Sequence, residues 1–227
     1  MESIGESIRG YDGAAMILYD YFRSSAAYRL RIALNLKGLS PERRFVHLRK
    51  AEQQGSDYLR INPQGLVPTL LVEGATLTQS LAIMEYLEET HPEPALLPAG
   101  AADRAWVRSV AQAIACDIHP IDNLRVLRYL DKTLHVDEAA RNDWYAHWIR
   151  LGFEAIESML GDRGGGAYAF GDTPTLADIC IVPQVANAGR VNLPMEPYPR
   201  IAAINARCLA HPAFAAAHPS RQPDAEP

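Results

Sequence analysis

Short apolar runs alternate with helical patterns in the first third of the chain. Residues 16–21 form an apolar and aromatic run that is too short for an independent helix, which predicts a strand. Residues 22–37 predict a turn and then a helix with a broad apolar face, which ends at Gly38. Residues 43–48 alternate well enough to predict a second strand. Two strands with a helix between them indicate a parallel βαβ unit.

The following segment predicts a hairpin placed between two helices. The expected elements are a short polar helix at 51–60, a turn-rich connection at 62–68, strands at 69–72 and 75–78, and a helix at 80–89. Glu73 and Gly74 suit the hairpin turn. Ser80 is the expected N-cap of the last helix.

Strand patterns almost vanish in the second half. Prolines after His91 prevent a helix and indicate a linker between domains. Long helical patterns follow at 101–131 and 137–160, and shorter ones at 175–187 and 199–208. The chain therefore predicts an α+β domain, βαβ-ββα, followed by an all-α domain. The expected division is a disordered leader at 1–15, the mixed domain at 16–91, a linker at 92–100, the helical domain at 101–217 and a loose C-terminal tail at 218–227.

The predicted helix at 175–187 has a complete N-terminal capping motif in the sequence. Thr175 can cap the helix at 175–187, and Asp178, three residues later, can accept a hydrogen bond from the backbone of the cap. This capping box indicates a role in folding rather than in catalysis.

Composition narrows the possible functions. The chain has 227 residues and a formal net charge of −5, without a basic run, which argues against a nucleic-acid-binding protein. No apolar run is long enough to span a membrane. Cys116, Cys180 and Cys208 are far apart and match no metal-site spacing, so we expect buried, reduced thiols in a cytoplasmic protein without a bound metal.

A pair of serines marks the candidate site. Ser24 and Ser25 stand where the first helix begins, with Arg23 before them and Arg29 one turn later. Hydroxyls at the positive end of a helix can bind an anion or a thiolate. Taken alone, however, the pattern favours a capped amphipathic helix whose arginines are solvated or form structural ion pairs, as we expect for Arg29 and Arg31.

Several motifs together resemble the cytosolic glutathione transferases. They are the Val67-Pro68 pair, Gln79-Ser80 before a helix, and the capping box at Thr175. The run from Ser24 to Leu34, S-S-A-A-Y-R-L-R-I-A-L, is similar to the signature of the zeta class, which includes maleylacetoacetate isomerase and maleylpyruvate isomerase. The resemblance extends from about Met16 to Pro223.

The resemblance implies a thioredoxin-like domain that binds glutathione, a helical domain that supplies most of the second-substrate pocket, and a homodimer. Ser24 would hydrogen-bond the glutathione sulfur and favour its thiolate. Val67 would pair its backbone with the tripeptide next to Pro68 as a cis-proline, and Gln79 and Ser80 would hold the γ-glutamyl carboxylate. Further glutathione contacts are implied at Ser25, Gln53, His119, Asn123, Leu124 and Arg125.

The implied reaction is glutathione-dependent cis–trans isomerisation of maleylacetoacetate to fumarylacetoacetate, by thiolate addition, rotation and elimination, in the catabolism of aromatic amino acids. The substrate is a small, acidic, unsaturated keto acid. Arg23, Arg125 and Arg190 are candidates for holding its carboxylates and the enolate, because guanidinium groups suit both. Each also has an ordinary structural interpretation: Arg125 suits a helix surface, and Arg190 a helix C-terminus.

Ala26 departs from the cysteine found in many zeta-class proteins. Chemistry that needs a protein thiol at this position is therefore excluded, whereas isomerisation through the sulfur of glutathione is not. Maleylpyruvate remains an alternative substrate, and a transferase acting on haloacids and other electrophiles is an alternative enzyme. A non-catalytic glutathione-fold binding protein is the alternative of another class.

Overall fold

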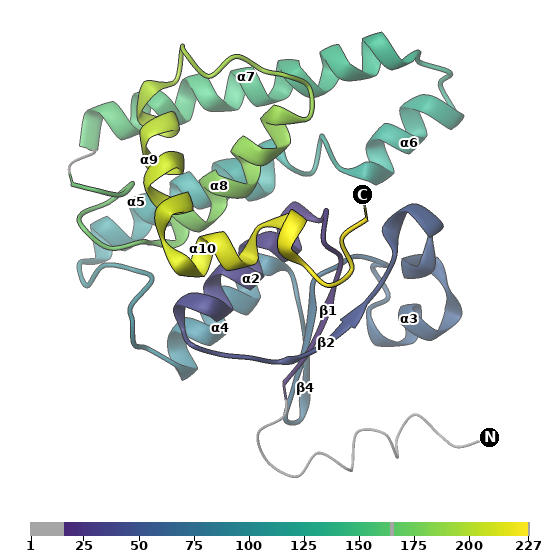
Figure 1. Ribbon diagram of the computed structural model, residues 1–227, viewed down its shortest axis with the longest axis horizontal. Coiled ribbons are helices and arrows are strands. Elements are labelled where there is room, and N and C mark those ends of the chain that lie inside the picture. The colour runs from purple at the N-terminus through teal and green to yellow at the C-terminus, as the bar shows by residue number, and fades with distance from the viewer. Residues whose placement is uncertain (1–15, 164–165, 227) are drawn as a thin grey trace. The chain divides into compact units, whose positions relative to one another are not determined.

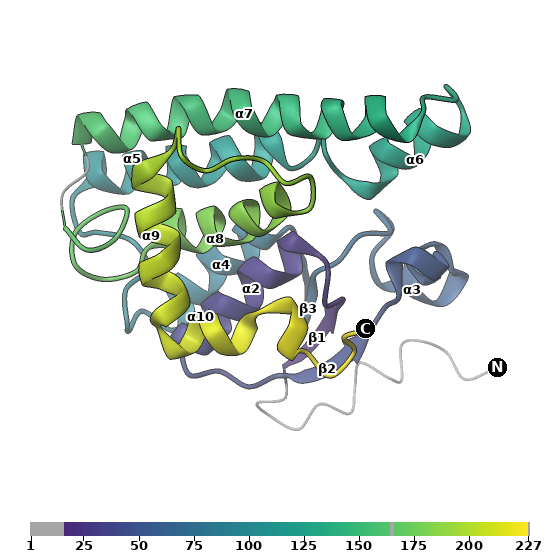
Figure 2. The same cartoon turned by 45° about the horizontal axis from the view of Figure 1, so that its top comes forward.

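The computed structural model describes residues 16–163 and 166–226 (Figures 1 and 2), so the expected disordered leader at 1–15 lies outside the described residues. The chain divides into two compact units. Among the described residues, the first comprises 16–94 together with 216–226, and the second comprises 95–163 and 166–215. The last segment of the chain thus belongs to the first unit.

A four-stranded sheet forms the centre of the first unit. Its strands are β1 (Ile17–Asp20), β2 (Glu42–Phe45), β3 (Thr69–Val72) and β4 (Ala75–Thr78), in the order β2-β1-β3-β4. β1 pairs in parallel with β2 and antiparallel with β3, and β3 and β4 form an antiparallel hairpin. This confirms the predicted βαβ unit and hairpin. β1 is a central strand that is buried along its whole length, and burial of both its faces explains its continuous apolar pattern.

The helices of the first unit differ from the prediction in one place. They are α2 (Ser25–Leu36), the 3₁₀ turns η1 (Leu48–Lys50) and η2 (Glu52–Gln54), α3 (Ser56–Ile61) and α4 (Ser80–Thr90). The helix expected at 51–60 is a 3₁₀ turn and a short α-helix, separated by Gly55 in an extended conformation. α2 ends as predicted, because Gly38 follows it with a φ of +68°.

Three cations on or directly after α2 are buried, so the alternative of solvated arginines is wrong for Arg29 and Arg31. Arg29, Arg31 and Lys37 are all less than one tenth exposed. The Lys37 ammonium donates to Glu88 Oε2 at 2.7 Å and to the Pro94 carbonyl at 2.8 Å. A helical pattern identifies these positions as polar but cannot show that acceptors distant in sequence pair with them inside the unit.

The second unit is helical (Figure 2). Its helices are α5 (Ala101–Gln112), the π-helix η3 (Ala113–Ile118), α6 (Leu124–Lys132), α7 (Glu138–Arg163), α8 (Leu176–Gly189) and α9 (Pro199–Ala210); α10 (Pro212–Ala217) follows and was not expected. The continuous helix expected over 101–131 is interrupted after the π-turn, where Pro120 cannot continue the backbone ladder. Cys116 lies on this π-turn and is exposed, which corrects the expectation that all three cysteines are buried.

The capping box of α8 is present as predicted. Asp178 Oδ2 accepts from the backbone N–H and the hydroxyl of Thr175, each at 2.8 Å. Its Oδ1 accepts from the backbone of Ala169 at 2.8 Å. Asp178 is fully buried, and this burial raises the pKa of its carboxyl. The box therefore fixes both the start of α8 and the loop before it.

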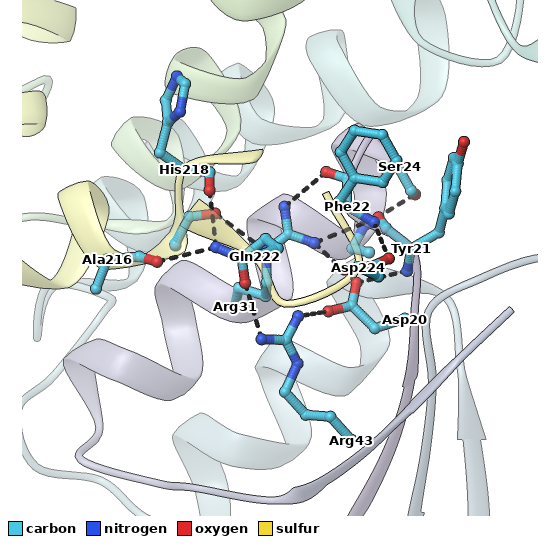
Figure 3. A network of polar contacts seen from close by, with 12 residues as sticks. Asp20, Tyr21, Phe22, Ser24, Arg31, Arg43, Ala216, His218, Gln222 and Asp224 are labelled. Atoms are coloured by element: carbon cyan, nitrogen blue, oxygen red, sulfur yellow. Dashed lines mark hydrogen bonds and ion pairs between the residues drawn. The ribbon is translucent and has the colours of Figure 1, made fainter. Parts of the chain in front are cut away.

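The C-terminal segment is bound to the first unit, so the expectation of a loose tail at 218–227 was wrong for the described residues (Figure 3). A 3₁₀ turn, η4 (Pro219–Arg221), is followed by Gln222, which is buried. Gln222 Nε2 donates to the carbonyls of Ala216 and His218 at 2.9 and 2.7 Å. A proline-rich composition does not reveal these specific polar contacts.

None of the helices in the described part of the chain is long and apolar enough to cross a membrane.

Candidate functional site

Ser24 is the N-cap of α2. Its Oγ accepts a hydrogen bond from the backbone N–H of Ala27 at 3.2 Å, and its side chain is only partly buried. A hydroxyl that accepts in this way still has its own proton to donate. Ser24 can therefore donate to an anion at the positive end of the helix, where the dipole also favours negative charge. Ser25 is the first residue of α2 and is buried, whereas Arg23 is exposed.

The turn before Ser24 is held by a buried ion pair (Figure 3). The Ser24 N–H donates to the Tyr21 carbonyl at 3.0 Å and closes the turn. Arg31 donates to the carbonyls of Tyr21 and Phe22 at 3.4 and 3.0 Å. The same guanidinium lies 2.8 Å from Asp20 Oδ1, which also accepts from the Tyr21 N–H at 2.7 Å. The predicted structural ion pair of Arg31 is thus confirmed, and it fixes the backbone next to Ser24.

A second backbone segment contributes Val67 and Pro68. The peptide bond between them is cis, as the family resemblance implied. Tyr58 Oη and Asn62 Nδ2 both donate to the carbonyl of Leu66, at 2.6 and 2.8 Å. Neither the N–H nor the carbonyl of Val67 is hydrogen-bonded within the described residues, so both can pair with a ligand.

The side chain of Val67 connects this segment to the turn before Ser24. It belongs to a hydrophobic cluster that includes Tyr21 and Phe22. The structure thus brings the Val67-Pro68 segment and the turn together, as the prediction of a common site requires.

The N-terminus of α4 carries two more predicted residues. Gln79 is the N-cap, with a φ of +68°, and Ser80 is the first helical residue, so Ser80 is not the expected cap. Gln79 Nε2 donates to Gln64 Oε1 at 3.0 Å. Arg29 Nη1 donates to Ser80 Oγ at 3.1 Å, and Arg29 is only 2% exposed. A buried cation beside a helix N-terminus favours the binding of a carboxylate.

Gln53 lies beside the loop that contains Gln64. Gln53 is 7% exposed, and its Oε1 has no hydrogen-bond partner within the described residues. Gly65, with a φ of +60°, passes so close that a Cβ there would lie 3.0 Å from the Gln53 carbonyl and 2.6 Å from Gln54 Nε2. Only glycine therefore allows this loop to pack against Gln53.

The remaining predicted residues lie in the second unit, on separate elements. His119 follows the π-helix, Asn123 is the N-cap of α6, and Leu124 is its first residue. Asn123 Oδ1 accepts from the backbone of Arg125 at 3.0 Å, so a capping role already accounts for this side chain. Arg125 is exposed in the first turn of α6, and Arg190 is exposed at the C-terminus of α8.

Sequence reasoning missed several side chains around these positions. Gln64, Asp122 and Asp224 were not selected, and Arg29 was expected only in a structural ion pair. Asp122 is 4% exposed, neither of its carboxylate oxygens has a hydrogen-bond partner within the described residues, and burial raises its pKa to about 8. The position of Asp122 directly before a helix cap gave no signal of burial.

Comparison with known proteins agrees with this geometry. Residues 14–89 match the family model described as glutathione S-transferase, N-terminal domain, and residues 138–204 match glutathione S-transferase, C-terminal domain. A probable maleylacetoacetate isomerase from Vibrio cholerae is 50% identical, over 93% of this chain and 99% of that protein. The chain therefore belongs to the glutathione S-transferase family.

Solved structures define the group within that family. The holo structure of a maleylpyruvate isomerase, described as a bacterial zeta-class transferase, is 50% identical with a TM-score of 0.91, covering 92% of this chain and all of that one. A maleylacetoacetate isomerase from Anaeromyxobacter dehalogenans with glutathione bound in its active site is 42% identical with a TM-score of 0.84, covering 93% and 98%. The chain is a member of this zeta-class isomerase group.

Proposed function

We propose that this protein is a glutathione-dependent cis–trans isomerase that converts maleylacetoacetate to fumarylacetoacetate. The observation that carries the proposal is the geometry of Ser24, whose hydroxyl caps α2 through its oxygen and still has a proton to donate. Relatives named for isomerisation of maleylacetoacetate and of maleylpyruvate support it.

The residues of the first unit fit glutathione. Gln53 offers a buried amide oxygen without a partner in the described residues, which suits an N–H of the tripeptide. The Val67 backbone suits a peptide group, and Gln79 and Ser80 offer the N-terminus of α4 to a carboxylate. A hydrogen-bond acceptor, a backbone segment that can pair with a peptide group, and a site for a carboxylate together match the groups that a γ-glutamyl peptide carries.

Bound glutathione supplies the thiolate that makes rotation about the substrate's double bond possible. Ser24 donates its hydroxyl proton toward the sulfur and stabilises the negative charge there. Arg23, Arg125 and Arg190 are the proposed partners of the substrate carboxylates and of the charge that develops on oxygen. Ala26 leaves no protein thiol in this turn, so the protein contributes binding and electrostatics rather than a nucleophile of its own.

The test is turnover of purified protein with maleylacetoacetate and with maleylpyruvate, each with and without glutathione. We expect turnover only with glutathione and faster turnover of maleylacetoacetate. Faster turnover of maleylpyruvate would reassign the substrate. No glutathione-dependent turnover of either would refute the isomerase and leave two alternatives, the transferase and the non-catalytic binding protein.

The concentration of glutathione during the assay separates isomerisation from conjugation. An isomerase regenerates glutathione in every cycle, so its concentration stays constant. A transferase acting on haloacids or other electrophiles consumes one glutathione for each product. Stoichiometric loss with a haloacid, and no isomerisation, would favour that alternative.

The homodimer and the cytoplasmic location implied by the family resemblance belong to the same proposal. Sedimentation velocity should give about twice the 25.0 kDa mass of one chain. A species of one-chain mass that retains full activity would contradict the dimer.

A further inference from the structure

The last residues of the chain contact the turn that precedes Ser24 (Figure 3). Asp224 Oδ2 accepts a hydrogen bond from the backbone N–H of Phe22 at 2.8 Å, across 202 positions of sequence. The carbonyl of the same residue accepts from Arg31 Nη2 at 3.0 Å. Both backbone groups of Phe22 are therefore held by charged side chains, one from α2 and one from the C-terminal segment.

Further contacts fix the segment 216–226, which we call the tail, in the place from which Asp224 reaches Phe22. They are Arg31 Nε to the Ala217 carbonyl (3.0 Å), Arg43 Nη1 to Gln222 Oε1 (2.8 Å) and His47 Nε2 to Glu226 Oε1 (2.7 Å). Ala225 packs against the hydrophobic cluster that contains Phe22. Contacts on both sides of Asp224 thus hold its carboxylate in position.

We propose that Asp224 is a positioning residue for Ser24, and that the tail completes the turn that activates the thiol of glutathione. This inference rests on the proposed function, because it assigns a task to the same turn. Phe22 lies two residues before Ser24 and is only 6% exposed, so its N–H needs a partner inside the protein. Without Asp224 that N–H loses its acceptor, and the turn can shift the donor away from the sulfur.

Three full-length variants test the proposal. Asp224→Ala removes the acceptor, whereas Asp224→Asn keeps an amide oxygen that can still accept from Phe22. Arg221→Ala alters an exposed residue of the same tail and serves as the matched control. Two readouts are measured on each: amide hydrogen exchange of residues 21–24 without glutathione, and the thiolate absorbance of bound glutathione against pH.

We expect Asp224→Ala to speed exchange of residues 21–24 by about tenfold and to raise the apparent pKa of the bound thiol by about one unit, since a hydrogen bond to a charged acceptor is lost. kcat/KM should fall by about tenfold. For Asp224→Asn, kcat/KM should stay within about threefold of the wild-type value, and Arg221→Ala should have the wild-type value. Unchanged exchange and an unchanged thiol pKa in Asp224→Ala would overturn the proposal. Faster exchange with an unchanged thiol pKa would also overturn it, because Asp224 would then stabilise the turn without affecting the thiol.

These outcomes are distinguishable from failure of the proposed function. If wild-type protein isomerises neither substrate, the isomerase assignment fails. Titration of bound glutathione still measures whether Asp224 acts on the thiol. If wild-type protein does not bind glutathione, both the proposed function and the inference drawn from it are refuted.

Discussion

Replacing Arg31 by methionine should destabilise the first unit strongly. Arg31 is 4% exposed, and its guanidinium donates to Asp20, to the carbonyls of Tyr21 and Phe22, and to the carbonyl of Ala217. Methionine replaces the aliphatic stem by an unbranched apolar chain and lacks the guanidinium, so the change removes the charge and the donors while keeping apolar packing close to α2.

The size of the loss in stability follows from the polar groups that lose their partner when Arg31 is replaced. Asp20 is fully buried, and breaking a buried pair by removing one partner costs about 3–5 kcal/mol. Arg43 still contacts the other carboxylate oxygen of Asp20, which reduces this cost. Three carbonyls lose a donor at about 1 kcal/mol each, partly recovered if water enters. We therefore expect the free energy of unfolding to fall by about 3 kcal/mol, a large part of the total of about 5–15 kcal/mol for a typical protein.

The assay is urea unfolding followed by two signals. Far-UV circular dichroism reports both units, whereas tryptophan fluorescence reports the second unit, because Trp106, Trp144 and Trp148 all lie there. The midpoint by circular dichroism should fall by about 1 M or more, given a slope of about 1–3 kcal/mol per molar urea.

The matched control is Arg44→Met, which removes an arginine paired with Glu42 where both side chains are about half exposed. This variant should lose less than about 1 kcal/mol. Equal midpoints for Arg31→Met and wild type, or an equal loss in both variants, would refute the reasoning that the buried network stabilises the first unit.

Three other changes have definite expected outcomes. Burial raises the pKa of Asp122 from 3.8 to about 8, so its carboxyl keeps a proton in the folded state that it loses in the unfolded state, and the stability of the protein falls as pH rises between these values. Asp122→Asn should therefore be more stable than wild type over that range, by a few kcal/mol at pH 8. A gain that does not depend on pH would contradict this. Gln79→Ala should raise the KM for glutathione several-fold with kcat unchanged, because Gln79 would bind glutathione equally in the ground state and in the transition state. A fall in kcat alone would count against this role in binding. Thr175→Val should lower the stability of the second unit by about 1–2 kcal/mol, measured by tryptophan fluorescence, since Asp178 loses a hydrogen-bond donor, and wild-type stability would exclude this contribution.

Local features of the fold could be predicted from the sequence because their causes are local. The cap at Ser24, the stop at Gly38 and the capping box at Thr175 each depend on residues within one helical turn. The hairpin turn at Gly74 depends on a single glycine with positive φ. These signals suffice for the order of the elements and for the position of Ser24.

The partners of the buried polar groups could not be predicted, because these partners are distant in sequence. Arg31 and Lys37 occupy positions that a helical pattern assigns to solvent, yet Asp20, Glu88 and the tail pair with them. Asp224 is 202 residues from Phe22, and no periodicity relates the two. The sequence therefore predicted the cap at Ser24 and the pairing of Arg31, but it did not predict which distant residues hold the turn.

We propose that the turn at the start of α2 activates the thiol of glutathione. The decisive experiment is a titration of the thiolate absorbance of glutathione bound to wild type, Ser24→Ala and Ser24→Thr. We predict a thiol pKa below that of free glutathione in wild type and in Ser24→Thr, which keeps the hydroxyl, and a value higher by about one to two units in Ser24→Ala. The same thiol pKa in wild type and Ser24→Ala would show that Ser24 does not activate the thiol.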